Sequence, residues 1–370
     1  MRIYNTKSLL SELTLAALIA SVAASPLAAR SDVPKVKGTA VDLNGFGPAI
    51  EGASVNEYGS IFAVDYRPQP VEDPDYTPNK FSFVSIAEGD PMEKSAPAVI
   101  LPEKGPIKTT YLAGSRYIGD GEFLLADALN KRVLRVKPKT GCFSEFCSDP
   151  GMLQPNDIAI HPKNKNIIYL SGQNYTETTK AGESGDLWMC DGKKATQFSP
   201  EFLGKAGVHR TNGIEVAPDG SMLYLSSAKN EGGKVIENMI FKIPLDSDGK
   251  MVQAAPYPYY TFADDPENDV DGMRADIEGN LYVTRNPAGR VVKIARSSKM
   301  PVLTIEMPGV KGPSNLEFGG KDGKELYAVG RCEADEKKGC AAKYLNDIPG
   351  RAWSELQKEK KDDKKDNKKV

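Results

Sequence analysis

The chain has 370 residues, of which 40% are hydrophobic and 26% are charged, so it can bury the core of one large domain or two ordinary ones. Its formal net charge of −2 excludes the general positive field of proteins that gather nucleic acid or bind anionic membranes. The 34 glycines and 26 prolines suit many short strands and turns better than a few long helices, so we expect an all-β fold.

The N-terminal region, residues 1–24, has the pattern of a secretory signal peptide. Arg2 and Lys7 precede an apolar run from Leu13 to Ala24, which ends in small residues. The run is shorter than the roughly 20 apolar residues that a transmembrane helix needs, and no later stretch approaches that length. We therefore expect a soluble, secreted, extracellular protein in which residues 25–44 form a lead-in segment before the folded domain.

An internal repeat organises the rest of the chain. Each copy has a small polar start, an alternating strand, a polar turn and a second strand, and in the four clear copies the second strand contains Tyr. The clear copies begin at Asn156, Asn212, Asp271 and Ser314, and two looser copies begin at Glu51 and Ala113. Successive starts lie 43 to 62 residues apart, close to the length that four short strands and their turns require.

Radial repetition of four-stranded sheets produces a β-propeller. A β-helix would need shorter and more regular repeats, and a helical array would show a helical periodicity that these segments lack. We therefore predict an all-β, six-bladed β-propeller with four-stranded blades over residues 45–345. Residues 346–370 follow as a C-terminal extension. Its last part, 358–370, alternates Lys with Asp and Glu and is predicted to be a disordered tail.

The repeat starts predict a ring of oxygen ligands around one end of the central channel, because the innermost strand of each blade lines that channel. The ring consists of two carboxylates and two amides, namely Glu51, Asn156, Asn212 and Asp271. Such ligands select a hard divalent cation, so Ca²⁺ is expected first, with Mg²⁺, Mn²⁺ or Zn²⁺ as alternatives. Asn-Gly, Asn-Asp and Asp-Gly are also common turn dipeptides, but their shared position in the repeat favours the metal ring.

The five cysteines fit export to an oxidising compartment. Close spacing predicts two local disulfides, Cys142–Cys147 and Cys332–Cys340. Cys190 is then left over in an apolar stretch, where we expect a buried and inert thiol. The sequon that begins at Asn174 predicts a glycan if the host glycosylates.

The repeat blocks resemble the gluconolactonase family, which also contains regucalcin. The resemblance spans about residues 45–330 and lies in the Glu-Gly pair at Glu51, "PNDIAIHP" at 155–162, "TNGIEVAPDGSMLYLS" from Thr211 and "DGMRADIEGNLYVTR" from Asp271. It implies a six-bladed propeller that hydrolyses sugar lactones and related cyclic esters with the help of a metal ion. It also implies that Glu51, Asn212 and Asp271 bind the metal, and that Asn156 binds the metal or the substrate.

The resemblance further implies that Asp271 is the catalytic general base, which accepts a proton from the attacking water. Sugar-binding members often have Arg two residues before the Asn of the third repeat, where this chain has Gln154, and this difference argues against a sugar-acid lactone. Other candidate substrate contacts are His209, three residues before Asn212, and Arg274. For Arg274 the alternative is a position in solvent or at a blade edge.

Three functions fit these observations. The first is a secreted, metal-dependent hydrolase of lactones or related esters, with a small-molecule substrate and no nucleic-acid or membrane partner, acting as a monomer. The second is a paraoxonase-like calcium lactonase, although only two histidines are present for the His-assisted form of that mechanism. The third is a non-catalytic propeller whose metal ties the blades together and whose top face binds a protein or a glycan.

Overall fold

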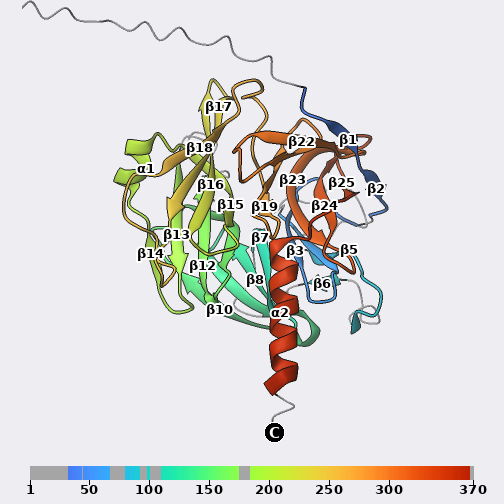
Figure 1. Cartoon of the computed structure of the whole chain (residues 1–370). Helices are drawn as coiled ribbons and strands as arrows, with labels where there is room; N and C mark the ends of the chain where they lie inside the picture. The colour runs from blue at the N-terminus through green and yellow to red at the C-terminus, as the bar shows by residue number, and fades with distance from the viewer. Residues whose placement is uncertain are drawn as a thin grey trace, which may run out of the picture. The chain divides into compact units, whose positions relative to one another are not determined.

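The described strands form six sheets arranged around a common centre as a six-bladed β-propeller, which confirms the predicted fold class (Figure 1). The computed structural model describes the following residues: 32–43, 45–66, 80–91, 98–100, 110–174 and 184–366. From residue 34 onward the chain forms one compact unit. The predicted signal peptide, 1–24, lies outside the described residues. In the part of the chain that is described, no helix is both long and apolar enough to cross a membrane.

Each blade is a small sheet whose consecutive strands pair in an antiparallel way. Blades 1 and 2 contain β3 (Ile50–Val55), β4 (Ile61–Asp65), β5 (Lys80–Ser85) and β6 (Ala98–Ile100), then β7 (Leu112–Gly119), β8 (Glu122–Asp127), β9 (Arg132–Lys137) and β10 (Cys142–Ser148). Blades 3 and 4 contain β11 (Gln154–His161), β12 (Asn164–Gln173), β13 (Gly185–Cys190) and β14 (Ala195–Gln197), then β15 (Arg210–Val216), β16 (Met222–Glu231), β17 (Lys234–Pro244) and β18 (Tyr257–Thr261). Blades 5 and 6 contain β19 (Met273–Ala275), β20 (Leu281–Arg285), β21 (Arg290–Ile294) and β22 (Pro301–Glu306), then β23 (Val310–Gly319), β24 (Glu325–Cys332) and β25 (Gly339–Leu345). A 3-10 helix, η2 (Pro138–Thr140), and a short helix, α1 (Pro200–Ala206), lie between strands.

The first strand of each blade is the innermost one. The six first strands, β3, β7, β11, β15, β19 and β23, form a closed ring in which each contacts the first strands of both neighbouring blades. The repeat starts lie within these strands, except that Asp271 lies just before β19. The repeats therefore share one register around the central channel.

Glycine follows several of the repeat starts because neighbouring inner strands approach each other backbone to backbone at that point. A Cβ at Gly114 would lie 2.7 Å from the carbonyl oxygen of Asn156, and a Cβ at Gly272 would lie 2.8 Å from Cα of Asn315. The strand register also shifts beside the repeat starts of β3, β7, β11 and β15, as at a β-bulge. These dipeptides therefore mark bulges or close backbone contacts at the inner strands, with Asp271-Gly272 directly before β19, and the alternative that they form turns is wrong.

Aromatic and branched side chains of adjacent blades pack against each other and form the core. Between blades 1 and 2, the ring of Phe123 lies with its centroid 4.7 Å from that of Phe62 and 4.8 Å from that of Phe81. Between blades 5 and 6, Tyr282 and Phe318 pack edge to face with centroids 4.9 Å apart. Successive side chains of a strand point to opposite faces of the sheet, so each blade carries apolar side chains on both of its faces. Every blade is therefore covered on both sides.

The segment before the first repeat closes the propeller. Strand β2 (Thr39–Val41) pairs with β25 and becomes the outer strand of blade 6, while β1 (Lys35–Lys37) runs parallel to β22 of blade 5. The prediction that residues 25–44 are a lead-in outside the propeller is therefore wrong for residues 35–41. Blade 6 has only three strands of its own, so its outer edge would otherwise lack hydrogen-bond partners.

The C-terminal extension contains a helix, α2 (Arg351–Asp366), so the predicted disordered tail, 358–370, is wrong as far as residue 366. Leu356 is buried in the core, and Trp353 packs against the same cluster. The side-chain amide of Gln357 donates a hydrogen bond of 2.8 Å to a backbone carbonyl between β3 and β4. These anchored first turns supply the costly helix nucleus, from which the helix continues into the segment of alternating charge. In Figure 1, α2 begins near the centre of the blades and extends past their edge.

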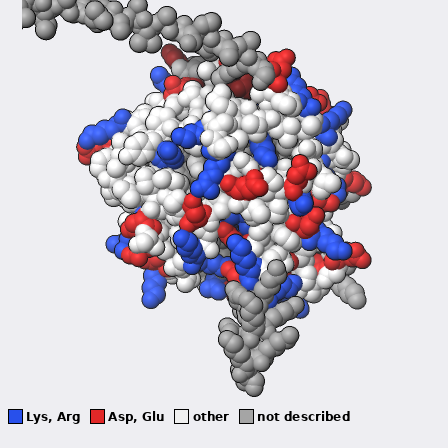
Figure 2. All heavy atoms as spheres, in the orientation of Figure 1, with Lys and Arg blue, Asp and Glu red and all other residues white. Residues whose placement is uncertain are grey.

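Charged side chains of both signs intermingle on the face that carries α2 (Figure 2). Arg296 and Asp219 form one exposed ion pair in the described surface, with nitrogen and oxygen 2.8 Å apart. Pairs of this kind contribute about 0–1 kcal/mol each to stability. The stability of the fold therefore depends on its buried contacts and covalent links far more than on this surface.

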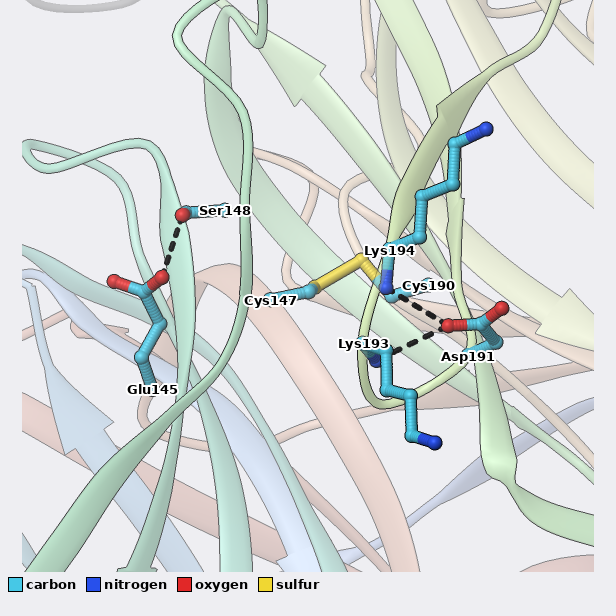
Figure 3. Close-up of a disulfide and its surroundings, with 7 residues drawn as sticks. All are labelled: Glu145, Cys147, Ser148, Cys190, Asp191, Lys193 and Lys194. Carbon is cyan, nitrogen blue, oxygen red and sulfur yellow. Dashed lines mark hydrogen bonds between the residues drawn. A yellow bond between two sulfur atoms is a disulfide. The ribbon is translucent and has the colours of Figure 1, made fainter.

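One of the two disulfides links different blades. Cys147 of β10 is bonded to Cys190 of β13, so this bridge ties blade 2 to blade 3 (Figure 3). Cys332 and Cys340 form the other bridge, as predicted, between β24 and β25. The predicted Cys142–Cys147 bridge is wrong, and Cys142 is an exposed free thiol. Both residues lie on one extended strand, where five steps of about 3.3 Å separate their Cα atoms too widely for a disulfide.

Removing the bridge between blades should destabilise the protein measurably. Replacing both Cys147 and Cys190 with Ala is expected to lower the free energy of unfolding by about 2–4 kcal/mol, because the bridge closes a sequence separation of 43 residues in the unfolded chain. Urea denaturation followed by circular dichroism measures the change. The matched control, Cys142→Ser, should unfold like the wild type. A peptide map of the unreduced protein that links Cys142 to Cys147 would contradict this pairing.

Candidate functional site

One end of the central channel, which we call the mouth, opens into a cavity of about 210 Å³. Two carboxylates from the blades on either side of blade 6, Glu51 of blade 1 and Asp271 of blade 5, line this cavity. Asn212 of blade 4 reaches Asp271 with a side-chain hydrogen bond. The structure therefore brings together three of the four predicted ligands. Asn156 occupies the equivalent position of β11, where it is half-buried and makes no side-chain hydrogen bond with another described residue.

Glu51 is held in surroundings that disfavour its negative charge. Burial raises its pKa well above the usual value for Glu, and the nearby carboxylates of Asp271 and Asp157 raise the pKa further. Two hydrogen bonds act in the opposite direction. The backbone N–H of Gly52 donates to Oε2 at 3.4 Å, and the side chain of Asn315 also bonds the carboxylate.

Asp271 shares this environment. Burial raises its pKa to about 7, and the charge of Asp269 contributes to the rise. The side-chain amide of Asn286 donates to Oδ2 of Asp271 at 2.8 Å, which partly offsets the effect. Arg210 also lowers the pKa of Asp271, but the guanidinium group of Arg210 forms an ion pair with Asp269. Two like charges thus meet at the mouth without a cationic side chain bound to either.

This donor set fits a divalent cation. It contains only oxygen donors, two of them charged, and a dication would offset the repulsion between the two carboxylates. Among the described residues, no three His, Cys, Asp or Glu side chains gather in the way of a metal site. The ring does not meet that description because half of its predicted ligands are amides. Calcium accepts amide oxygens and water together with carboxylates.

Arg274 lies inside the channel in a layer of buried charge. Its side chain is 1% exposed, with Nε 3.0 Å from Glu317 and Nη1 3.3 Å from Asp157. Arg116 adds a further pair with Asp157 at 3.0 Å. The alternative of a solvent or blade-edge position is wrong. Arg274 is also absent from the described lining of the mouth cavity, so the structure does not support the predicted substrate contact.

Arg274 connects the buried layer to Glu51 through an amide. Its Nη2 donates to Oδ1 of Asn315 at 2.7 Å, and the backbone N–H of Leu316 donates to the same oxygen at 2.9 Å. Because Oδ1 receives both donors, the NH₂ group of Asn315 is free to donate to Glu51. Sequence reasoning missed Asn315. Asn315 directly follows Ser314, a repeat start whose hydroxyl group already donates hydrogen bonds to backbone carbonyls. Its position next to a repeat start was the signal by which the sequence could have identified it.

The two remaining predicted substrate contacts lie outside the described lining of the mouth cavity. Gln154 is buried at the start of β11, where its backbone pairs with Gln173. His209 donates its backbone N–H to Ser227 at 2.8 Å, and the adjacent Arg210 is the residue that reaches toward the acidic side chains. Asn174, the predicted glycosylation site, is half-buried directly after β12, and the next two residues of its sequon lie outside the described residues.

The opposite end of the channel is closed by α2. Arg351, the first residue of the helix, is buried and donates through Nε to Glu215 of β15 at 3.1 Å. Its Nη1 lies 2.8 Å from Glu355 in the next turn. These carboxylates raise the pKa of Arg351 above its usual value, so the charge is retained in the buried position. The mouth is therefore the end of the channel at which a small molecule would meet the carboxylates.

A family model described as the SMP-30/Gluconolactonase/LRE-like region matches residues 95–329, more than half of the chain. The chain belongs to this family. The predicted resemblance is thereby confirmed, although the first three strands of blade 1, with Glu51, precede the matched residues. The three other ring residues, Asn156, Asn212 and Asp271, lie within them.

Relatives and solved structures agree with this assignment. Regucalcin from Xenopus laevis is 27% identical over 124 residues, a match that covers 33% of this chain and only 38% of that protein. The structure of the calcium-binding protein regucalcin from Agrobacterium tumefaciens is similar with a TM-score of 0.63 at 16% identity, covering 86% of this chain and 96% of that one. A gluconolactonase from Xanthomonas campestris is similar with a TM-score of 0.57 at 14% identity, covering 85% and 97%. At these identities the two structures establish a shared fold.

The buried layer below the mouth should be essential for stability. Arg274→Met is expected to lower the free energy of unfolding by about 3–5 kcal/mol, because it leaves the carboxylate of Glu317 buried without its closest cation. Chemical denaturation followed by tryptophan fluorescence measures the loss. The matched control is Arg296→Met, which removes an exposed pair and should cost about 1 kcal/mol or less. Equal losses in the two variants would contradict the structural role of Arg274.

Proposed function

We propose that this protein is a hydrolase of lactones or related cyclic esters that requires a divalent cation and acts at the mouth cavity. The observation that supports this most directly is the pair of carboxylates, Glu51 and Asp271, in one desolvated cavity of a gluconolactonase-family propeller. A gluconolactonase and a calcium-binding regucalcin among the structures of similar fold favour the same interpretation.

In this proposal the cation is held by the ring residues Glu51, Asn156, Asn212 and Asp271, and Ca²⁺ is the first candidate. The cation would polarise the ester carbonyl and stabilise the negative charge that develops on its oxygen. Asn315 orients the carboxylate of Glu51, and Asn286 and Asn212 orient that of Asp271. These partners restrict the rotation of both carboxylates before substrate arrives.

Asp271 is the proposed general base. Its Oδ2 is held by Asn286, and the two oxygens of a carboxylate allow one group both to be a ligand and to accept a proton. Water attacks the carbonyl carbon while Asp271 takes one of its protons. The bond between that carbon and the ring oxygen then breaks, and the proton passes to the departing oxygen. The product is a hydroxy acid, and Asp271 returns to its ionised form.

The alternative of a non-catalytic, metal-stabilised propeller is favoured by one observation. The proposed ligands come from four different blades, so a bound cation would tie blades 1, 3, 4 and 5 together. The paraoxonase-like alternative is less well supported, because neither of the two histidines of the chain lies in the described lining of the mouth cavity. Metal-dependent stability is expected of both remaining hypotheses, so turnover distinguishes them.

We also propose that the protein is secreted. The N-terminal pattern of residues 1–24 supports export, and two disulfides are typical of proteins in oxidising compartments. A cavity of this size suits a small-molecule substrate. The near-neutral net charge gives no support to a nucleic-acid partner.

Replacing the proposed base should remove turnover. Asp271→Ala is expected to lower kcat/KM by roughly 10²- to 10⁴-fold on any lactone that the wild type hydrolyses, because it removes the group that would accept the proton of the attacking water. The assay uses aldono-, aliphatic and aromatic lactones, with Ca²⁺, Mg²⁺, Mn²⁺ or Zn²⁺ added to chelator-treated protein. The matched control, Glu267→Gln, removes a charge from the exposed acidic segment before Asp271 and should retain activity. Equal turnover by Asp271→Ala and wild type would exclude this mechanism.

Cation binding should stabilise the fold. With Ca²⁺ at 100 times its Kd, the free energy of unfolding is expected to rise by about 2.7 kcal/mol, and the melting temperature of chelator-treated protein should rise with it. Glu51→Gln removes one ligand charge and should abolish most of this shift, whereas Glu267→Gln should retain it. A shift of equal size in Glu51→Gln would show that the cation binds elsewhere. Stabilisation without turnover of any lactone would favour the non-catalytic hypothesis.

A further inference from the structure

Arg331 is the one cationic side chain among the described residues that line the mouth cavity. It lies near the end of β24, on the central strand of blade 6, and faces the cavity together with Asn286 and Gly312. None of the proposed steps of hydrolysis uses it. Its presence beside Glu51 and Asp271 therefore needs a separate explanation.

A gap at Gly312 connects Arg331 to the proposed reaction centre. A Cβ at Gly312 would lie 2.9 Å from Oδ1 of Asn286 and 3.8 Å from Nη2 of Arg331, so a side chain at this position would collide with the amide, and glycine leaves this part of the cavity wall open. Asn286 in turn donates to Asp271 at 2.8 Å. Arg331 is thus separated from the proposed base by a single side chain. A small molecule whose ester meets Asp271 would also be within reach of Arg331.

The guanidinium group of Arg331 is only weakly neutralised by its own protein. Its side chain is 38% exposed, and its described ion pair is a contact of 3.8 Å from Nε to Glu336, which is longer than a hydrogen bond. Lys311 already donates to the other oxygen of Glu336. The two terminal nitrogens of Arg331 make no hydrogen bond with the residues that the structure describes. They retain the paired donors that suit a carboxylate.

The backbone that carries Arg331 is fixed on both sides. It pairs with Gly312 of β23 and with Gly339 of β25. The next residue, Cys332, is bonded to Cys340 across the same strands. The guanidinium group is therefore presented from a rigid element, as a group that selects among ligands must be.

We propose that Arg331 determines specificity by binding an anionic substituent of the substrate, so that the mouth accepts esters bearing a carboxylate in addition to the ester carbonyl. The proposal rests on the hydrolase function proposed above. A bidentate contact to Arg331 would orient the substrate with its ester toward Asp271 and its carboxylate across the gap at Gly312. A neutral lactone would lack this second point of attachment.

Binding of ligands that cannot be hydrolysed tests the proposal without relying on turnover. Calorimetry with Ca²⁺-loaded protein compares tetrahydrofuran-2-carboxylate with tetrahydrofuran-2-carboxamide, which differ in charge and have nearly the same size. The wild type should prefer the carboxylate, and Arg331→Gln should weaken carboxylate binding by roughly 10- to 100-fold with little effect on the amide. Lys311→Gln is the matched control, since it disturbs the same Glu336 without reaching the cavity lining.

Equal binding of the two ligands by the wild type would overturn the proposal. The proposal would also fail if Arg331→Gln unfolds at the wild-type temperature and still prefers the carboxylate as strongly as the wild type does. If the wild type hydrolyses lactones, the KM for a carboxylate-bearing lactone should rise in Arg331→Gln while kcat and the KM for its carboxamide change little. If no lactone is hydrolysed but carboxylate binding depends on Arg331, the hydrolase function fails and Arg331 remains an anion-binding residue. The two failures are therefore distinguishable.

Discussion

The close approach of six inner strands around one axis is the constraint on which the rest of this structure depends. At the mouth these strands meet backbone to backbone, and glycines such as Gly114 and Gly272 leave no room for a side chain between them. The residue before each such contact occupies the same level of the channel. Polar groups from blades that are distant in the sequence consequently converge on a space of about 210 Å³. The site follows from the packing of the strands, because no local segment carries it alone.

Because the inner strands converge on one axis, charged side chains also gather there and must be neutralised inside the protein. Below the mouth, Arg274 and Arg116 lie between Asp157 and Glu317, and Arg351 of α2 approaches from the other end. Breaking a buried set of this kind costs far more than losing a surface pair, because the remaining charges stay without partners. The layer also supports the mouth, since Arg274 orients an amide that bonds Glu51. Stability and site geometry are coupled through that amide.

The two carboxylates at the mouth have no comparable cationic partner, and this contrast distinguishes the site from the layer beneath it. A buried layer with matched charges is complete without a ligand, whereas Glu51 and Asp271 are buried beside like charges with no cationic side chain bonded to either among the described residues. At 14–16% identity to solved members of similar fold, the scaffold has been retained while the walls of the mouth can differ. Substrate choice is therefore best sought in wall residues such as Arg331, and less in the ring itself.

The sequence by itself determined the features that recur with a local period. Repeated strand and turn patterns predicted the six blades and the register that joins Glu51, Asn212 and Asp271. Close spacing predicted the disulfide between Cys332 and Cys340, although the same argument paired Cys147 wrongly. Only the tertiary structure decided the contacts between segments without such a pattern: the bridge from Cys147 to Cys190, the strand Thr39–Val41 in blade 6, the anchoring of α2, the burial of Arg274 and the approach of Arg331 to the mouth. The physical reason is that a repeat reports the alternation of buried and exposed positions within one blade, whereas these contacts depend on how separate blades are placed around the axis.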